Sequence, residues 1–223
     1  MIRMTCVSMI WIRICWMREC PKIFNMKPTL VVLAGPTAIG KTSCGIELAC
    51  HFGTEIISAD SRQIYRECTI GTAVPSPEEL AQVKHHFIQS ISVRDRYNAS
   101  LYEQQVLERL EQLFRKHEVV LMVGGSGLYI DAVCRGIDEL PRVDPGLREA
   151  LQARLKKEGL EALTRELKIL DPVSHGKVDL KNHMRVLKAL EISIQTGKPY
   201  SAFLSAEKKE RPFRILRVAL DMN

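Results

Sequence analysis

The chain has 223 residues, of which 46% are hydrophobic and 26% are charged. This supplies one sizeable core, or a core domain with a smaller inserted one, and the balance is ordinary for a soluble α/β protein. The net charge of +6 is compatible with a polyanionic partner but does not decide for one. Seven cysteines without a C-x-x-C pair or a zinc-ligand spacing indicate reduced thiols, so we expect a cytoplasmic protein.

Residues 1–25 form an apolar stretch that three arginines interrupt. The stretch lacks the unbroken apolar segment and the small-residue cleavage site of a signal peptide. It is also short and charged for a membrane span. We expect a disordered or artefactual N-terminal extension, with Met26 as the true start, and a membrane anchor is the alternative.

The next segment, 26–140, predicts alternating strands and helices. Short apolar runs occur at 29–34, 54–60 and 118–125, with a weaker candidate at 85–89. Such runs are typical of parallel strands that are buried on both faces. Apolar residues at helical spacing predict helices over 41–52 and 102–116. The alternation predicts an α/β fold with a parallel sheet flanked by helices.

The pattern changes near Pro141. An Asp-Pro pair at 144–145 is typical of a helix N-cap followed by proline at the first helical position. Leucines then recur at helical spacing, and a further helix is expected over 181–195, where a Gly-Lys-Pro sequence ends it. We therefore expect a helical insertion domain, rich in Arg and Lys, over 141–200.

The last segment, 201–223, returns to the core domain. Its run over 213–222 again predicts a strand, and no helix follows it in the sequence. Because strands of a parallel sheet are normally covered on both faces, we expect the core to be incomplete at the C-terminus.

A phosphate-binding loop lies between the first expected strand and the first expected helix. The sequence that fits G-x-x-x-x-G-K-[ST] is Gly35-Pro36-Thr37-Ala38-Ile39-Gly40-Lys41-Thr42. Its glycines let backbone N–H groups approach a phosphate, and the start of a helix favours the anion. Lys41 adds a positive charge, and the Thr42 hydroxyl is a ligand for Mg²⁺. We expect phosphate or diphosphate binding, with Mg²⁺ as cofactor.

A carboxylate is expected to face this loop. The strand at 118–125 ends in glycines, whereas the strand at 54–60 ends in Asp60. The carboxyl ends of parallel strands line the ligand crevice of such folds. Asp60 is therefore a candidate general base or metal partner, and a helix N-cap together with Ser61 is the alternative.

Four further segments follow the loop in a characteristic order. They are Asp60-Ser61-Arg62-Gln63-Ile64-Tyr65, Gly71-Thr72-Ala73, His85-His86-Phe87-Ile88 and Gly124-Gly125-Ser126-Gly127-Leu128-Tyr129-Ile130. Within the insertion, two more are Arg185-Val186-Leu187-Lys188-Ala189-Leu190-Glu191 and Thr196-Gly197-Lys198-Pro199. Together with the loop they resemble the tRNA dimethylallyltransferase family, and the resemblance runs from about Met26 to Asn223.

The resemblance implies a P-loop NTPase-like core that transfers a dimethylallyl group from dimethylallyl diphosphate to N6 of adenosine 37 in tRNAs reading codons that begin with U. It implies that the loop holds the diphosphate with Mg²⁺, that Asp60 is the general base, and that Lys41 and Ser126 belong to the reaction centre. Many members have threonine where Ser126 stands. The implied tRNA contacts are Asp60, Ser61, Arg62, Gln63, Ser126, Arg148, Met184, Arg185, Val186, Leu187 and Lys188. We expect a monomer without a membrane partner.

Three other functions share part of this pattern. An adenylate isopentenyltransferase has the same loop and carboxylate but uses a free nucleotide, and the basic insertion favours tRNA over it. A small-molecule kinase would transfer phosphate from ATP. A non-enzymatic RNA-binding protein has no use for a phosphate loop beside a carboxylate.

Overall fold

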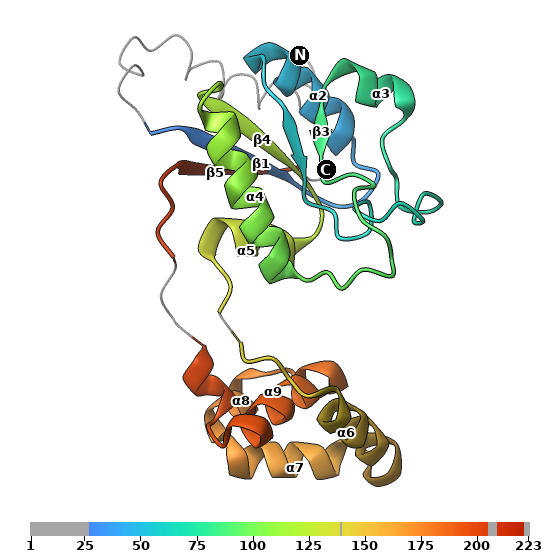
Figure 1. The fold of residues 1–223 in the computed structure, drawn as a ribbon, viewed down its shortest axis with the longest axis vertical. Helices are drawn as coiled ribbons and strands as arrows, with labels where there is room; N and C mark the ends of the chain where they lie inside the picture. The colour runs from blue at the N-terminus through green and yellow to red at the C-terminus, as the bar shows by residue number, and fades with distance from the viewer. Residues whose placement is uncertain (1–26, 139, 205–208, 221–223) are drawn as a thin grey trace, which may run out of the picture. The chain divides into compact units, whose positions relative to one another are not determined.

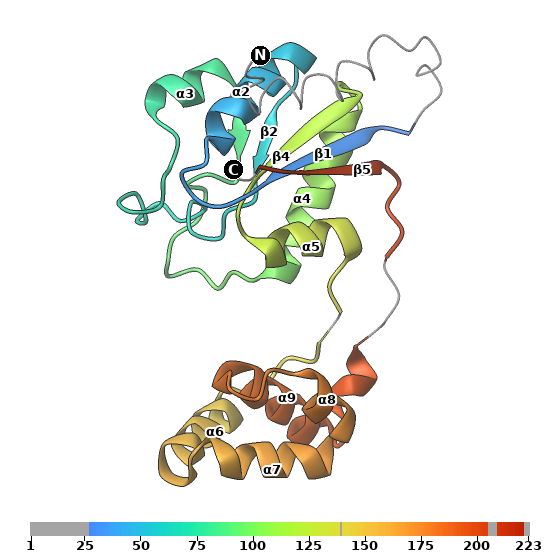
Figure 2. The same cartoon turned by 180° about the vertical axis from the view of Figure 1, so that it is seen from behind.

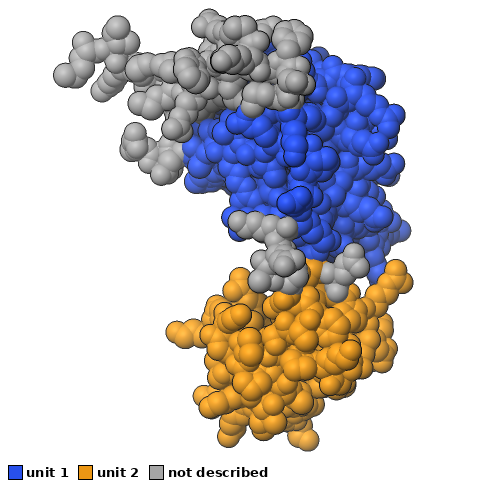
Figure 3. Space-filling view, turned by 90° about the vertical axis from the view of Figure 1, so that its left-hand side faces the viewer, with its two compact units in different colours: residues 1–137, 209–223 blue, residues 138–208 orange. Residues whose placement is uncertain are grey.

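The computed structural model describes residues 27–138, 140–204 and 209–220. The expectations for residues 1–25 lie outside this part of the chain. The chain divides into one compact unit of residues 1–137 with 209–223 and a second of residues 138–208 (Figure 3). The second unit extends beyond the expected insertion, 141–200, because the backbone N–H of Ser201 still donates to Oδ2 of Asp171 in that unit at 2.7 Å.

The first unit is built on a parallel sheet (Figure 1). Its strands within the described residues are β1 (Thr29–Ala34), β2 (Ile56–Ser58), β3 (His85–His86), β4 (Val119–Gly124) and β5 (Arg214–Ala219). They lie in the order β3-β2-β4-β1-β5, so that β4 is central and β1 lies between β4 and β5, with Thr29 paired to both Val119 and Arg214. The predicted α/β fold with a parallel sheet is confirmed.

Helices cover both faces of this sheet (Figures 1 and 2). The covering helices are α2 (Lys41–Phe52) on one face and α4 (Ala99–Phe114) and α5 (Gly127–Arg135) on the other, and α3 (Pro77–Gln82) packs beside α2. Leu30 and Val32 of β1 pack into the cluster formed with α4 and α5, and the alternate Val31 and Leu33 pack with α2. Because successive side chains of a strand point to opposite faces, burial on both faces explains the continuous apolar run of this strand.

Two expected strands are shorter in the structure than in the prediction. The run at 54–60 forms a strand only over Ile56–Ser58, and the run at 85–89 only over His85–His86. Beyond β2 the backbone leaves the ladder, since the carbonyl of Ala59 accepts the N–H of Ser126 at 3.1 Å. Beyond β3 the chain turns at Phe87, which has φ 63°.

The second unit is helical. It contains α6 (Pro145–Glu158), α7 (Leu160–Leu170), α8 (Pro172–Lys177), α9 (His183–Thr196) and the 3₁₀ helix η2 (Tyr200–Phe203). Leucines of α6, α7 and α9 form its core, among them Leu151, Leu163 and Leu190. The predicted N-cap is confirmed, because Asp144 accepts the N–H of Gly146 and Pro145 opens α6. None of the helices in the described ranges combines the length and apolarity that a membrane crossing requires.

Candidate active site

The phosphate loop connects β1 directly to α2. Gly40 has φ 90° and Ala38 has φ 65°, so the loop turns through the left-handed region before the helix begins at Lys41. A Cβ on Gly35 would lie 2.7 Å from the carbonyl oxygen of Leu220, which explains the glycine there. The N-cap residue of α2 is Gly40, and within the described ranges no side chain caps the start of this helix. Its first N–H groups therefore remain available to an anion.

Lys41 lies at the base of this loop, where its ammonium group donates to the carbonyl of Pro36. Partial burial lowers the pKa of Lys41, and the carboxylate of Asp60 partly offsets this by raising it. The opposing effect of Asp60 means that the two side chains are close enough to interact electrostatically. The structure thus brings together the lysine and the carboxylate that the sequence predicts for one site.

Asp60 lies two residues after Ser58, the last residue of β2. Its Oδ1 accepts the backbone N–H of Arg62 at 2.8 Å and of Gln63 at 3.3 Å. The carboxylate therefore caps a turn with one of its oxygens. This agrees in part with the alternative interpretation of Asp60 as a helix N-cap. Within the described residues the other oxygen, Oδ2, accepts no hydrogen bond, so it is available to a substrate.

Ser126 links the turn after β4 to the turn after β2. Its hydroxyl accepts the backbone N–H of Ser61 at 2.8 Å and donates to the Ser61 hydroxyl at 3.0 Å. Ser126 precedes α5, yet its side chain does not cap that helix. The turns approach so closely that a Cβ on Gly124 would lie 2.3 Å from the carbonyl oxygen of Ala59. The predicted residues Asp60 and Ser126 therefore belong to one constellation.

The side chains of Gln63 and Arg62 differ in whether their polar groups already have hydrogen-bond partners. The Gln63 amide donates to the carbonyls of Thr72 at 3.1 Å and Ala73 at 2.8 Å, and its Oε1 accepts the Ser58 hydroxyl at 3.2 Å. Gln63 thus holds the loop at 71–73 in place. Arg62 is exposed, and its guanidinium makes no hydrogen bond or ion pair within the described part of the chain. Of the two, Arg62 has the side chain that is available to an external anion.

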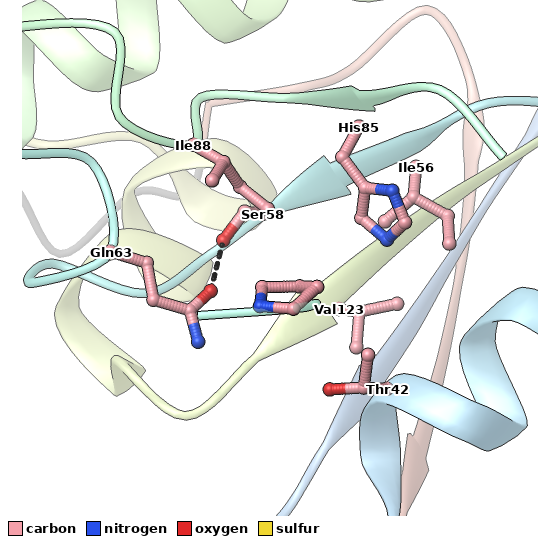
Figure 4. Close-up of a pocket in the computed structure, with 8 residues that line it drawn as sticks. Thr42, Ile56, Ser58, Gln63, His85, Ile88 and Val123 are labelled. Carbon is pink, nitrogen blue, oxygen red and sulfur yellow. Dashed lines mark hydrogen bonds between the residues drawn. The ribbon is translucent and has the colours of Figure 1, made fainter. Parts of the chain in front are cut away.

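A small pocket lies beside Thr42, between α2 and the ends of β2 and β4 (Figure 4). Its lining residues are Thr42, Ile56, Ser58, Gln63, Pro75, His85, Ile88 and Val123. The Nδ1 atom of His85 lies 2.8 Å from the carbonyl oxygen of Val83, and burial lowers the pKa of this imidazole. His85 is thus mostly neutral at neutral pH, and it adds no positive charge beside the phosphate loop.

The donors around the phosphate loop fit a Mg²⁺ ion that arrives with a diphosphate. Among the residues that the structure describes, no three His, Cys, Asp or Glu side chains gather to hold a metal on their own. The site offers instead the hydroxyl of Thr42 and the carboxylate of Asp60. Mg²⁺ at phosphate sites commonly takes one or two protein oxygens and completes its shell with phosphate oxygens and water.

In the second unit, Arg148 makes a bidentate ion pair. Its Nε and Nη2 lie 2.8 Å and 2.9 Å from the two carboxylate oxygens of Glu191, whose side chain is only 4% exposed. This pairing secures α6 to α9. The residue that the resemblance assigns to tRNA contact therefore has a structural partner within its own unit.

The expected tRNA segment at the start of α9 presents two kinds of side chain. Val186 and Leu187 are buried in the leucine core of the second unit and are not available to an external ligand. Met184 and Arg185 are exposed. Lys188 is half-buried, and burial lowers its pKa. The outward-facing residues of this segment are therefore Met184 and Arg185, with Lys188 partly accessible.

Tyr102 of α4 contacts the end of β2, and the sequence pattern did not single it out as a site residue. The pattern marks it only as a core position of the helix at 102–116. In the structure its hydroxyl donates to the carbonyl of Ser58 at 2.7 Å, two residues before Asp60. The available signal was a tyrosine on the apolar face of a predicted helix, since a buried tyrosine hydroxyl usually has a hydrogen-bond partner.

Comparison with known proteins gives a consistent family. The model of a family described as IPP transferase matches residues 63–223. Similar curated proteins include tRNA dimethylallyltransferase 1 of Bacteroides thetaiotaomicron, which is 51% identical over 193 residues, and tRNA dimethylallyltransferase 2 of Porphyromonas gingivalis, which is 53% identical over 192 residues. The alignments cover 86% of this chain but only 63% and 64% of those relatives, so the chain spans just under two thirds of their length.

Solved structures show the same fold. A tRNA delta(2)-isopentenylpyrophosphate transferase from Staphylococcus epidermidis is 28% identical with a TM-score of 0.51, and the match covers 86% of this chain and 63% of that one. A eukaryotic dimethylallyltransferase acting on tRNA is 24% identical with a TM-score of 0.70, and the match covers 86% of this chain and 48% of that one. The second likeness concerns the fold alone.

Proposed function

The chain belongs to the IPP transferase family, and on this premise we propose that it transfers a dimethylallyl group from dimethylallyl diphosphate to N6 of adenosine 37 in tRNAs reading codons that begin with U. The observation that carries the proposal is that the phosphate loop and Asp60 follow two parallel strands of one sheet, β1 and β2, and so lie at the same end of it, with Asp60 near enough to raise the pKa of Lys41. This arrangement sets a proton acceptor beside a diphosphate site. The tRNA acceptor, the cytoplasmic location and the Mg²⁺ cofactor belong to the same proposal.

The phosphate loop binds the leaving group. As the bond between the allylic carbon and the diphosphate oxygen breaks, negative charge grows on the diphosphate. The Lys41 ammonium and the uncapped N–H groups of α2 stabilise that charge. A Mg²⁺ ion held by Thr42 and the diphosphate would add Lewis-acid stabilisation of the same charge. This part of the site therefore lowers the barrier to departure of pyrophosphate.

Asp60 acts as the general base for the acceptor, the adenine N6. The lone pair of the adenine N6 forms the new bond to the allylic carbon, and an N6 proton must leave. Oδ2 of Asp60, which carries no hydrogen bond within the described residues, takes that proton, while Oδ1 keeps the carboxylate oriented through the N–H groups of Arg62 and Gln63. Because the base is stacked in the anticodon loop, the enzyme must draw it out to reach this oxygen.

Contacts to the RNA backbone come from exposed cations of each unit. Arg62 stands next to the reaction centre without an intramolecular partner for its guanidinium in the described residues. Arg185 is exposed at the start of α9, beside the exposed Met184. Such groups bind phosphates and orient the RNA. Gln63, Val186 and Leu187, whose side chains are occupied or buried, support these contacts from within the protein.

The acceptor is tested directly with the purified chain. Labelled dimethylallyl diphosphate is offered with Mg²⁺ and either an unmodified tRNA that has A37, the same tRNA with G37, or AMP. The expected result is label in the A37 tRNA alone. Transfer to AMP but not to tRNA contradicts the proposal in favour of a free-nucleotide transferase. Phosphate transfer from ATP, without use of dimethylallyl diphosphate, contradicts it in favour of a kinase.

A further inference from the structure

The side chain of Tyr102 contacts the end of β2 and the segments that follow the neighbouring strands β3 and β4. Tyr102 of α4 is 0% exposed and shares its core cluster with Val106 and Leu110 on the same helix. Its hydroxyl donates to the carbonyl oxygen of Ser58, the last residue of β2, at 2.7 Å. This is a buried hydrogen bond between residues 44 positions apart. It therefore ties α4 to the end of β2.

The Ser58 carbonyl needs this donor because its strand loses a neighbour at that point. On one side β2 pairs with β4 as far as Ser58, but on the other side the pairing with β3 ends at Ile57 and His86. The left-handed Phe87 then turns the chain out of the ladder. A buried carbonyl without a partner is unfavourable, so the Tyr102 phenol replaces the missing strand.

The ring of Tyr102 also contacts Phe87, which directly follows β3, and Tyr129 of α5, the helix that follows β4. It stacks on the ring of Tyr129 with a centroid separation of 4.3 Å and an interplanar angle of 25°. The ring of Phe87, just after β3, meets it edge-on at 5.4 Å. The backbone N–H of Tyr129 in turn donates to the carbonyl of Ser126 at 3.0 Å. The Tyr102 side chain thus contacts Ser58, two residues before Asp60, and Tyr129, three residues after Ser126.

Burial keeps the hydroxyl of Tyr102 protonated, so that it remains a donor. Burial raises the pKa of Tyr102 well above its ordinary value. The hydroxyl therefore keeps its proton at neutral and moderately alkaline pH, and its bond to Ser58 does not titrate.

We infer that Tyr102 is a positioning residue for the proposed prenyl transfer. By holding the Ser58 carbonyl and stacking on Tyr129, it sets the spacing between the turn that carries Asp60 and the turn that carries Ser126. The inference rests on the proposed function, because it assigns Tyr102 to the geometry of that reaction. Tyr102 itself touches no reacting atom.

The variant Tyr102→Phe tests this, since it removes the hydroxyl and keeps the ring. We expect kcat to fall between about tenfold and a hundredfold, with KM for tRNA and for dimethylallyl diphosphate changed by less than about twofold, because misplacing a reacting group by up to about 1 Å has such an effect. Amide hydrogen exchange of residues 58–61 should also become faster.

The matched control is Val106→Ala, one helical turn further along the same buried face. It removes apolar contacts from the same core without a bond to Ser58, so it should lower the melting temperature at least as much while kcat stays within about twofold. Tyr102→Phe with unchanged kcat, or Val106→Ala with an equal loss of kcat, overturns the inference. Absence of transfer by the wild-type chain contradicts the proposed function itself, which is a different result.

Discussion

Ser61 and Ser126, 65 positions apart in the sequence, share a pair of hydrogen bonds. The N–H of Ser61 donates to the Ser126 hydroxyl at 2.8 Å, and that hydroxyl donates to the Ser61 hydroxyl at 3.0 Å. Because Ser61 directly follows Asp60, the pair fixes the turn that carries the proposed base. The candidate site is therefore made of the turns after β1, β2 and β4, with Ser126 as the link between the last two.

The Ser126 hydroxyl should matter for rate more than for binding. We expect Ser126→Ala to lower kcat about tenfold, the equivalent of roughly one net hydrogen bond at the transition state. Ser126→Thr keeps the hydroxyl and should retain most of the activity. Steady-state prenyl transfer to tRNA measures both. Full activity of the alanine variant would show that the link to Ser61 does not position Asp60.

The charge of Lys41 should make diphosphate binding sensitive to alkaline pH. Its pKa is lowered by burial, so the ammonium form that binds the anion is lost at a lower pH than for an ordinary lysine. Affinity for inorganic pyrophosphate should therefore weaken as pH rises through the lowered pKa. Lys41→Arg should bind over a wider alkaline range, because a guanidinium stays charged.

Titration calorimetry with pyrophosphate at several pH values checks this. Lys41→Met should bind at least about tenfold more weakly at neutral pH, the loss of a charge-assisted hydrogen bond. The exposed Lys116, replaced by methionine, is the control and should bind as the wild type does. An affinity that is equal for wild type and Lys41→Met excludes Lys41 from the phosphate site.

Gly124 should tolerate no side chain. The methyl group of Gly124→Ala would lie 2.3 Å from the Ala59 carbonyl oxygen, so β2 and β4 must move apart. We expect a loss of about 1–3 kcal/mol in the free energy of unfolding, the usual effect of overpacking. Gly127→Ala is the matched control, since its methyl group meets nothing within 4 Å and it opens α5. Urea unfolding of the two variants should separate them clearly.

The ion pair of Arg148 should stabilise the second unit. Arg148→Ala leaves the buried Glu191 carboxylate without its partner, and we expect a loss of about 1–3 kcal/mol in unfolding free energy. The double variant Arg148→Ala with Glu191→Leu should recover part of it, because the unpaired charge is gone. Among the residues that the structure describes, the exposed Arg165 bonds only to its own helix, at the carbonyl of Glu161. Arg165→Ala should change stability by less than about 0.5 kcal/mol.

Thermal unfolding followed by circular dichroism distinguishes these variants. If Arg148→Ala unfolds as the wild type does but binds tRNA more weakly, then Arg148 acts on the RNA and the ion pair with Glu191 is incidental.

The parts of the fold that depend on local sequence could be predicted. The strand at 29–34 and the helix at 41–52 occur as expected, because an apolar run, a glycine-rich turn and a helical pattern follow one another directly. α5 was not predicted, since its glycine-rich beginning has low helix propensity. Packing of Tyr129 and Ile130 into the core outweighs that propensity.

The site was predictable as a set of residues but not as a set of contacts. The motifs single out Asp60 and Ser126, yet only the folded chain shows that the Ser126 hydroxyl binds Ser61. Likewise, helical spacing cannot reveal that Arg148 pairs with Glu191 or that Tyr102 reaches Ser58, because these partners lie on other elements. Contacts between distant segments depend on how the elements pack.

The central claim is that Asp60 accepts the proton from adenosine N6, and Asp60→Asn tests it most directly. The measurement is the single-turnover rate of prenyl transfer to A37 tRNA, together with the dissociation constant for that tRNA, with Glu111→Gln on the exposed surface of α4 as the control. We predict a rate lowered by about 10²–10⁴-fold for Asp60→Asn, as expected for loss of a general base, with tRNA affinity within a few-fold. A rate close to that of the wild type would contradict the account.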